Sequence, residues 1–176
     1  MTSIIKVNNI QNSSGTAYNF IKQIKQAVLT DVQTVSSLDT RTDVTNLSVA
    51  ITPSSTSSKI LVTTHISYGG SNNNLYASGY LMRDSTDIGV NTTATGNQFN
   101  ISFGMDLTGQ ANETYKLRNS SMSFLDSPSS TSSLIYKVQV RVNSNGTLYI
   151  NRTGDNSNAD YGSKGISTLT IMEVAG

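Results

Sequence analysis

Side chains able to carry out chemistry are few in this sequence. His65 is the only histidine, and the chain contains no cysteine. A disulfide framework and a thiolate metal site are therefore excluded, and a histidine metal site lacks further ligands. On the expected strand Lys59–Ser67, His65 shares a face with Leu61 and Thr63. We interpret it as a surface or interface residue, and we predict neither a metal site nor a cofactor.

Carboxylates offer a second possible chemistry, because glycan hydrolysis uses two of them beside the scissile bond. Glu113 and Glu173 are the only glutamates, and the nine aspartates mostly fall in turns, where they bond to the backbone. Asp155–Asp160 invites a calcium interpretation, but Ser157 and Ala159 break the spacing of a calcium loop. We do not expect an enzyme; a glycan depolymerase is kept as an alternative.

Polar tips between strands are better candidates for binding. Loops held by a rigid sheet commonly carry recognition, and tyrosines flanked by amides and hydroxyls suit stacking on a sugar. The segments 72–76, 91–97 and 156–161 have this composition. The candidate receptor-binding residues are Asn72, Asn74, Tyr76, Asn156, Asp160 and Tyr161. For any single residue, a plain soluble turn is the competing interpretation.

Composition narrows the class of protein. In 176 residues, apolar residues make up 36% and charged residues 13%, while 67 residues are Ser, Thr or Asn. This balance is typical of short strands joined by small polar turns. The net charge of +1 gives no electrostatic footprint for nucleic acid. We find no secretory signal and no apolar run of transmembrane length, so we expect no membrane insertion.

The strongest structural pattern is the segment Leu134–Arg152. From Tyr136 to Val142 its side chains alternate strictly between apolar and polar, as in a half-buried antiparallel strand. Asn145 and Gly146 then predict a tight hairpin turn, with Leu148 and Ile150 on the return strand. Alternation recurs in eight to ten strands, one of them Gln98–Leu107. We predict an all-β fold: an antiparallel, jelly-roll-like β-sandwich over residues 31–176.

Residues 1–30 differ from the rest and are predicted to form an N-terminal attachment arm. Its lysines have no acidic counterpart before Asp31. Apolar side chains from Ala17 to Val28 follow helical spacing, which predicts one short helix. The helix either lies on its own domain or docks to a neighbour. The expected anchoring residues are Ile5, Val7, Phe20, Ile21 and Ile24.

The last strand, Ser167–Val174, carries apolar side chains on both faces. Leu169 and Ile171 lie on one face, and Met172 and Val174 on the other. One face can meet the domain core, whereas the second needs a cover. A subunit interface supplies that cover, so the sequence predicts a homo-oligomer.

Three segments carry a resemblance to a known family. SVAITPSSTSSKILV (48–62), FLDSPSSTSSLIYKVQV (124–140) and GISTLTIMEVAG (165–176) resemble segments of tail-fibre and virion-appendage proteins of tailed bacteriophages, especially marine and cyanobacterial phages. The resemblance covers roughly residues 45–176 and implies a trimeric β-sandwich domain of a virion. Many fibres carry long repetitive shafts, whereas here only about thirty residues precede the β domain.

The resemblance sets the functional expectation. It implies a fibre or fibre-tip domain that forms a homotrimer, binds another virion protein through residues 1–30, and contacts host-surface polysaccharide through its tips. A capsid decoration or head-fibre protein that stabilises the particle is the first alternative, and the depolymerase is the second. The expected location is the virion, assembled in the host cytoplasm.

Overall fold

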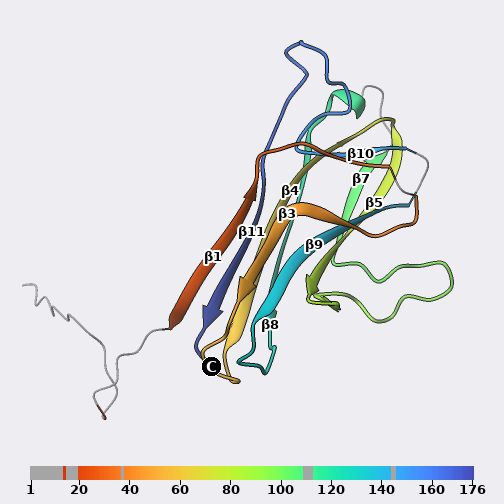
Figure 1. The fold of residues 1–176 in the computed structure, drawn as a ribbon. Helices are drawn as coiled ribbons and strands as arrows, with labels where there is room; N and C mark the ends of the chain where they lie inside the picture. The colour runs from red at the N-terminus through yellow and green to blue at the C-terminus, as the bar shows by residue number, and fades with distance from the viewer. Residues whose placement is uncertain (1–13, 15–19, 37, 109–112, 144–145) are drawn as a thin grey trace, which may run out of the picture.

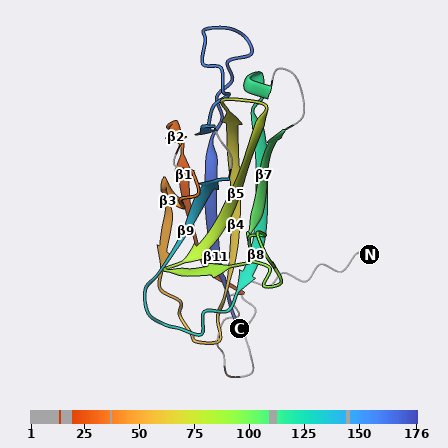
Figure 2. The ribbon, with the colours of Figure 1, turned by 90° about the vertical axis from the view of Figure 1, so that its right-hand side faces the viewer.

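The computed structural model describes Ser14 and residues 20–36, 38–108, 113–143 and 146–176. Over this part of the chain, eleven strands form two antiparallel sheets, and the single helical element is the short 3-10 turn η1 (Glu113–Tyr115). The two sheets form the layers of a sandwich (Figures 1 and 2). The predicted antiparallel β-sandwich is confirmed. Among the described residues, no helix is long and apolar enough to cross a membrane.

The first sheet is built around its longest strand, β4. Its members are β1 (Ile21–Leu29), β2 (Gln33–Val35), β4 (Lys59–Gly70), β8 (Arg118–Asp126), β10 (Leu148–Ile150) and β11 (Ser167–Val174). β4 pairs with β11 and β10 along one side and with β8 along the other. β1 pairs with β11, and β2 pairs with β10. β1 and β2 together form one interrupted strand, and β11 and β10 form a second one beside it. The sheet is therefore effectively four strands wide.

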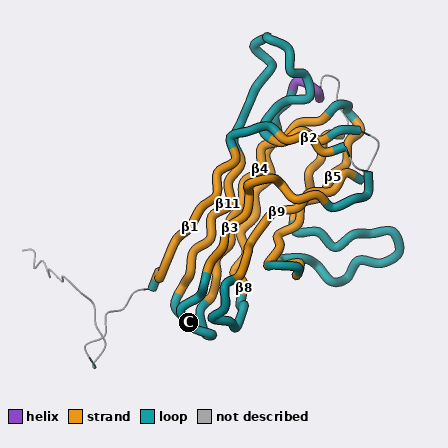
Figure 3. The backbone as a smooth tube through the Cα atoms, in the orientation of Figure 1, coloured by secondary structure: helices purple, strands orange, loops and turns teal. Residues whose placement is uncertain are grey.

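The second sheet is built around β5 and β9. Its members are β3 (Thr42–Ile51), β5 (Asn74–Arg83), β6 (Thr86–Ile88), β7 (Phe103–Thr108) and β9 (Leu134–Val142). β9 lies between β3 and β5, and the other side of β5 pairs with β6 and β7. Figure 3 shows the long connection between β6 and β7 projecting from the sandwich.

The strand order is that of a jelly roll. Counting β1 with β2, β6 with β7 and β10 with β11 gives eight strands. When these eight are numbered along the chain, the strands of the first sheet lie side by side in the order first, eighth, third, sixth. Those of the second sheet lie in the order second, seventh, fourth, fifth. This double Greek key is found in viral capsid and lectin domains, among others.

The helix predicted over residues 17–28 is wrong where the structure describes it. Residues 21–29 form β1, which pairs with β11 from Ile21 opposite Val174 to Leu29 opposite Ser167. A register shift follows Ile21 and breaks the alternation, so the apolar spacing mimics a helix. Residues 21–29 of the expected arm therefore belong to the sheet. Ile5 and Val7 lie outside the described residues.

The predicted hairpin over Leu134–Arg152 is also wrong. β9 belongs to the second sheet, whereas β10 pairs with β4 and β2 in the first. The chain therefore crosses between the layers after Val142. The alternation correctly identifies the inward residues of both strands, because Leu148 and Ile150 are fully buried. It does not identify the strand that each one pairs with.

The core lies between the sheets and follows the alternation. In β9, Tyr136, Val138, Val140 and Val142 have no exposed surface. Leu169 and Ile171 of β11 are equally buried. β11 lies between β1 and β4, so it is an interior strand of its sheet, with Met172 and Val174 turned to the outer face.

An ion pair inside the sandwich ties the two sheets together. Nη1 of Arg83 on β5 donates to both carboxylate oxygens of Asp126 on β8, at 2.8 and 2.7 Å. The hydroxyl of Tyr136 on β9 donates to Asp126 Oδ2 at 2.7 Å. Burial raises the pKa of Tyr136, and its bond to Asp126 raises the pKa further. Asp126 therefore holds β8 against both central strands of the opposite layer.

Glu173 fixes the connection between β3 and β4. Its carboxylate accepts hydrogen bonds from the backbone and hydroxyl of Ser54, the hydroxyl of Ser58 and the amide of Gln23. Burial alone would raise the pKa of Glu173, but these hydrogen bonds outweigh it and lower the pKa to about 2. The second of the two glutamates thus has a structural role, in joining β11 to β1 and to the Pro53–Ser58 loop.

Candidate functional site

Residues 72–76, the first predicted tip, form partly a turn and partly an exposed surface of the sheet. Asn72 Oδ1 accepts a hydrogen bond from the backbone N–H of Asn74 at 3.0 Å, so Asn72 closes the turn before β5. Tyr76 lies on the outer face of the second sheet and is 51% exposed. The backbone N–H of Asn143 donates to the Tyr76 carbonyl, which places the ends of β5 and β9 together.

The third predicted tip, residues 156–161, lies in the connection between β10 and β11. This connection projects from the end of the sandwich opposite the C-terminus (Figure 2). Asn156 and Asp160 are exposed, and the Tyr161 ring lies 4.5 Å from the Tyr115 ring of η1. Hydrogen bonds from Ser157 lower the pKa of Asp155, so this carboxylate organises the loop. Within the described residues, no group of three His, Cys, Asp or Glu side chains could hold a metal ion.

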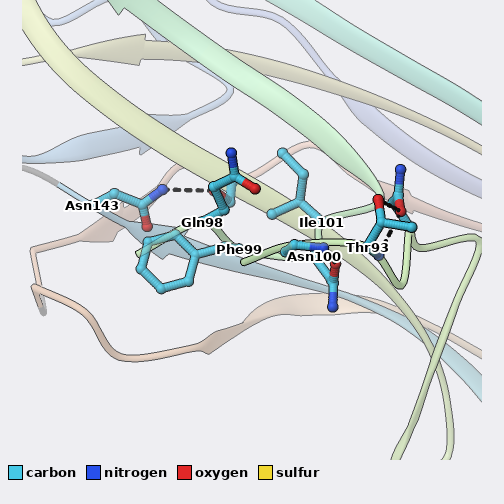
Figure 4. Close-up of a pocket in the computed structure, with 9 residues that line it drawn as sticks. Thr93, Gln98, Phe99, Asn100, Ile101 and Asn143 are labelled. Atoms are coloured by element: carbon cyan, nitrogen blue, oxygen red, sulfur yellow. Dashed lines mark hydrogen bonds between the residues drawn. The ribbon is translucent and has the colours of Figure 1, made fainter. Parts of the chain in front are cut away.

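The predicted tip 91–97 belongs to the β6–β7 connection, which covers a polar pocket on the outer face of the second sheet. The pocket has a volume of about 420 Å³ (Figure 4). Its lining residues are Ser78 of β5, Asn143 after β9, and Asn91, Thr93, Ala94, Gln98, Phe99, Asn100 and Ile101 of the connection. The sequence placed 98–101 at the start of a strand, but β7 begins only at Phe103.

Hydrogen bonds within the connection shape the pocket wall. Asn91 Oδ1 accepts from the backbone and hydroxyl of Thr93, at 2.8 and 2.7 Å. Asn100 Oδ1 accepts from the Ala94 backbone, and Gln98 Oε1 accepts from the Thr95 backbone, both at 3.1 Å. These three side chains use their carbonyl oxygens on the loop itself. No hydrogen bond from their amide nitrogens is present among the described residues.

The pocket floor comes from the sheet. Asn143 Nδ2 donates to the Ser78 hydroxyl at 2.6 Å. Asn143 Oδ1 is buried and has no hydrogen-bond partner within the described part of the chain. The Arg141 guanidinium lies 3.9 Å above the Phe99 ring and donates to Asp39 at 2.7 Å. Arg141 therefore fixes Phe99 at the pocket rim.

Charged pairs lie on the same outer face as the pocket. Asp43 accepts from Lys137 at 2.9 Å and from Gln139 at 2.7 Å. Partial burial raises the pKa of Asp43, but these two bonds outweigh it and leave the pKa below its ordinary value. Arg41 pairs with both oxygens of Asp87 and lies 3.8 Å above the Tyr80 ring. The hydrogen bond to Asp87 raises the pKa of Arg41.

The outer face of the first sheet is different, because an apolar row crosses it. Ile24 of β1 lies opposite Met172 of β11, Met172 opposite Leu61 of β4, and Leu61 opposite Leu125 of β8. Ile24 and Leu125 are 56% and 52% exposed, and the two central residues are half-buried. We call these four residues the apolar row.

The neighbouring rows extend this surface in both directions. Ile21 and Val174 lie opposite each other on one side of the apolar row. On the other side, hydroxyl and amide groups bond to one another across the strands, Gln26 to Thr170 at 2.7 Å and Thr63 to Ser123 at 3.1 Å. His65 lies one row further on and contacts the Ser121 hydroxyl at 3.0 Å.

Of the five predicted anchoring residues, the structure describes three. Phe20, Ile21 and Ile24 are all at least half exposed, and Ile24 belongs to the apolar row. Leu61 and Leu125 complete that row but were not predicted as site residues. The pairings of β1 with β11, β11 with β4 and β4 with β8 bring them into one row with Ile24, and no local sequence pattern encodes those pairings.

Comparisons with known proteins give similarity of structure only. No family model matches the sequence, and no curated protein matches it. Among solved structures, the chain is similar to the infectious bursal disease virus VP2 subviral particle, at 12% identity and a TM-score of 0.45, over 97% of this chain and 42% of that one. For the Gx strain of the same virus the values are 11%, 0.42, 98% and 43%. The chain spans about two fifths of the length of these viral chains.

Proposed function

We propose that this protein is a structural component of a virion, which assembles with copies of itself and with another virion protein. Following the sequence resemblance, we assign it to a trimeric fibre or fibre tip of a tailed phage. The jelly-roll strand order supports a structural role, because this architecture recurs in viral capsid domains. The resemblance of residues 48–62, 124–140 and 165–176 to phage appendage segments supports the narrower assignment.

The observation that carries the proposal is the apolar row on the outer face of the first sheet. Isolated exposed apolar side chains are ordinary, but contiguous ones mark interaction surfaces. Here four residues from four neighbouring strands form one continuous line. Covering such a surface contributes about 25 cal/mol for each Å² of apolar area removed from water. We assign this cover to a neighbouring copy of the chain.

The molecule also has two distinct ends. Ile21 and Val174 lie where β1 begins and β11 finishes, near the C-terminus (Figure 1). The polar connection between β10 and β11 projects from the opposite end. This arrangement suits a protein that is attached at one end and exposes polar loops at the other. Residues preceding β1 would reach the partner virion protein.

Truncation of the chain tests the attachment role. Because β1 belongs to the sheet, the informative deletion removes residues 1–19 and leaves Ile21–Leu29 in place. We expect the truncated chain to keep the circular dichroism spectrum and oligomeric state of the full chain, but to be missing from assembled particles. Truncated chain present in particles at the level of the full chain would contradict the attachment role.

Sedimentation tests the oligomer separately. We expect the purified full chain to sediment as a trimer of 18.8 kDa subunits. If the protein sedimented only as an 18.8 kDa monomer, even at a protein concentration as high as that within a particle, this result would contradict the proposed assembly through the apolar row.

A further inference from the structure

We propose that the pocket under the β6–β7 connection binds a neutral sugar unit. This inference deepens the proposed assignment to a phage fibre or fibre tip and depends on it only for the biological source of the sugar. The pocket volume of about 420 Å³ falls within the range of about 300–1,000 Å³ that is usual for small-ligand sites. The chemistry of its lining residues determines which class of ligand it can bind.

The pocket has no charged lining. All nine lining residues are amides, hydroxyls or apolar side chains. The nearby Arg141 is engaged with Asp39 and with the Phe99 ring. A phosphate, a carboxylate or an ammonium group would therefore enter without a counter-charge, at the cost of its hydration. A neutral ligand carrying many hydroxyl groups has no such cost.

The floor of the pocket supplies an acceptor that needs a donor. Asn143 Oδ1 is buried and unpaired within the described part of the chain, while Asn143 Nδ2 is held by Ser78. Leaving a buried acceptor unpaired costs about 1–3 kcal/mol, so binding energy is gained when a small shift of the β6–β7 connection admits a ligand O–H to Asn143 Oδ1. The Ser78 hydroxyl, which accepts from Asn143, keeps its own hydrogen for donation.

The loop wall supplies the complementary donors. The carbonyl oxygens of Asn91, Gln98 and Asn100 are used within the connection. Their NH₂ groups, which make no hydrogen bond among the described residues, are donors in a fixed position. A sugar hydroxyl both donates and accepts, and so it matches a pocket with an acceptor on its floor and donors on its wall. A purely apolar ligand would leave these groups unpaired.

Phe99 supplies the apolar platform. Its ring is 48% exposed, although Arg141 covers one face. Figure 4 shows Phe99 beside Asn143 and Gln98. The C–H face of a pyranose packs on such a ring while its hydroxyls reach the amides. The site therefore differs from the Tyr76 and Tyr161 tips predicted from the sequence, and the two assignments can be separated experimentally.

The test uses the full chain and a panel of methyl glycosides: glucoside, galactoside, mannoside and N-acetylglucosaminide, with glucuronide as the charged comparison. Amide chemical shifts of ¹⁵N-labelled protein are followed during titration. We expect at least one neutral glycoside to shift the amides of residues 91–101 and 143 with a saturable isotherm. We expect no saturable shift with the glucuronide.

Variants then locate the binding site. Phe99→Leu keeps an apolar side chain under Arg141 but removes the flat ring, and Asn143→Ala removes the buried acceptor. Each should weaken binding about tenfold, as expected for the loss of roughly 1.4 kcal/mol. Ala94→Leu fills the pocket without removing a hydrogen bond and should abolish binding even if Asn143→Ala perturbs the fold. Tyr161→Leu, with a comparably exposed ring in another loop, should bind as the unmodified chain does.

Three results would overturn the inference. They are the absence of saturable shifts with every neutral glycoside, shifts confined to residues around Tyr76 or Tyr161, and equal binding by the Ala94→Leu chain. Sedimentation and particle incorporation are measured on the same proteins. Absence of sugar binding by the unmodified chain, with normal assembly, therefore refutes only the pocket, whereas failed assembly with intact sugar binding refutes only the structural role.

Discussion

The two outer faces of the sandwich have opposite surface chemistry. On the second sheet, Asp43, Asp87 and Asp39 pair with basic side chains, and a polar pocket lies beside them. On the first sheet, four cross-strand rows between Ile21 and Ser121 contain one lysine, Lys59, and no carboxylate. An ion-paired face tolerates water, whereas an apolar row gains from being covered. The comparison assigns assembly to the first face and ligand binding to the second.

The largest expected effect comes from placing charge on the apolar row. Leu61→Glu combined with Met172→Glu should abolish self-association, because each carboxylate would be buried without a partner in the interface. We expect a shift to monomer by sedimentation velocity with the fold retained, since both side chains point outward. Asn156→Glu, at an exposed loop, is the matched control and should leave the oligomer intact. If the double variant remained oligomeric, the outer face of the first sheet would not be the assembly surface.

A buried ion pair sharpens the contrast with the exposed pairs. Asp126 is 6% exposed and neutralises Arg83 inside the sandwich. Asp126→Asn should lower the free energy of unfolding by about 1–3 kcal/mol, because the half-buried Arg83 guanidinium loses its counter-charge. Urea denaturation of the two chains measures this difference. A loss under 1 kcal/mol would mean that Arg83 finds water or another partner.

Acid stability tests Glu173, the buried carboxylate of β11. The pKa of Glu173 is about 2 when folded, below the ordinary value for a glutamate. Its contribution to stability is therefore complete above about pH 4.5 and is lost as the pH falls toward 2. The difference in unfolding free energy between the unmodified chain and Glu173→Gln should shrink over this interval. A constant difference from pH 6 to pH 2.5 would contradict the assigned hydrogen bonds.

The smallest effect is expected on the ion-paired face. Asp43→Asn removes the exposed pair with Lys137 and should cost about 0–1 kcal/mol. Added salt should reduce this small difference further, because exposed pairs are screened. Urea denaturation at low and high ionic strength provides the measurement. If Asp43→Asn lowered the free energy of unfolding as much as Asp126→Asn does, the pair of Asp43 with Lys137 would be shielded from solvent and not exposed.

Alternation in the sequence predicted the layers but not the partners. In β9, every second side chain is buried as expected, and the same holds for Leu169 and Ile171 of β11. Which strands pair is decided by packing between distant segments. The hairpin prediction failed for this reason: an Asn-Gly turn is as compatible with a crossing between sheets as with a return along the same sheet.

The binding pocket was harder to predict for a related reason. Phe99 and Ile101 continue the alternation of β7, so they were assigned to that strand instead of to a loop that folds over the sheet. Ser78 and Asn143 come from other strands, and only the pairing of β5 with β9 brings them together. The polar composition of 91–97 did indicate a binding loop. It contained no information about what that loop would face.

The pairing of β1 with β11 also has a consequence for biosynthesis. The backbone N–H of Ala175 bonds to the carbonyl of Phe20, so the earliest and latest strands of the jelly roll are neighbours. The first sheet cannot close until β11 has left the ribosome, and until then the nascent chain presents β1 without its partner. Pairing between strands so far apart in the sequence is slow, and until it is complete the unpaired strand edge is prone to aggregation. Yield in the cell should therefore depend on chaperones that hold the chain until β11 has emerged.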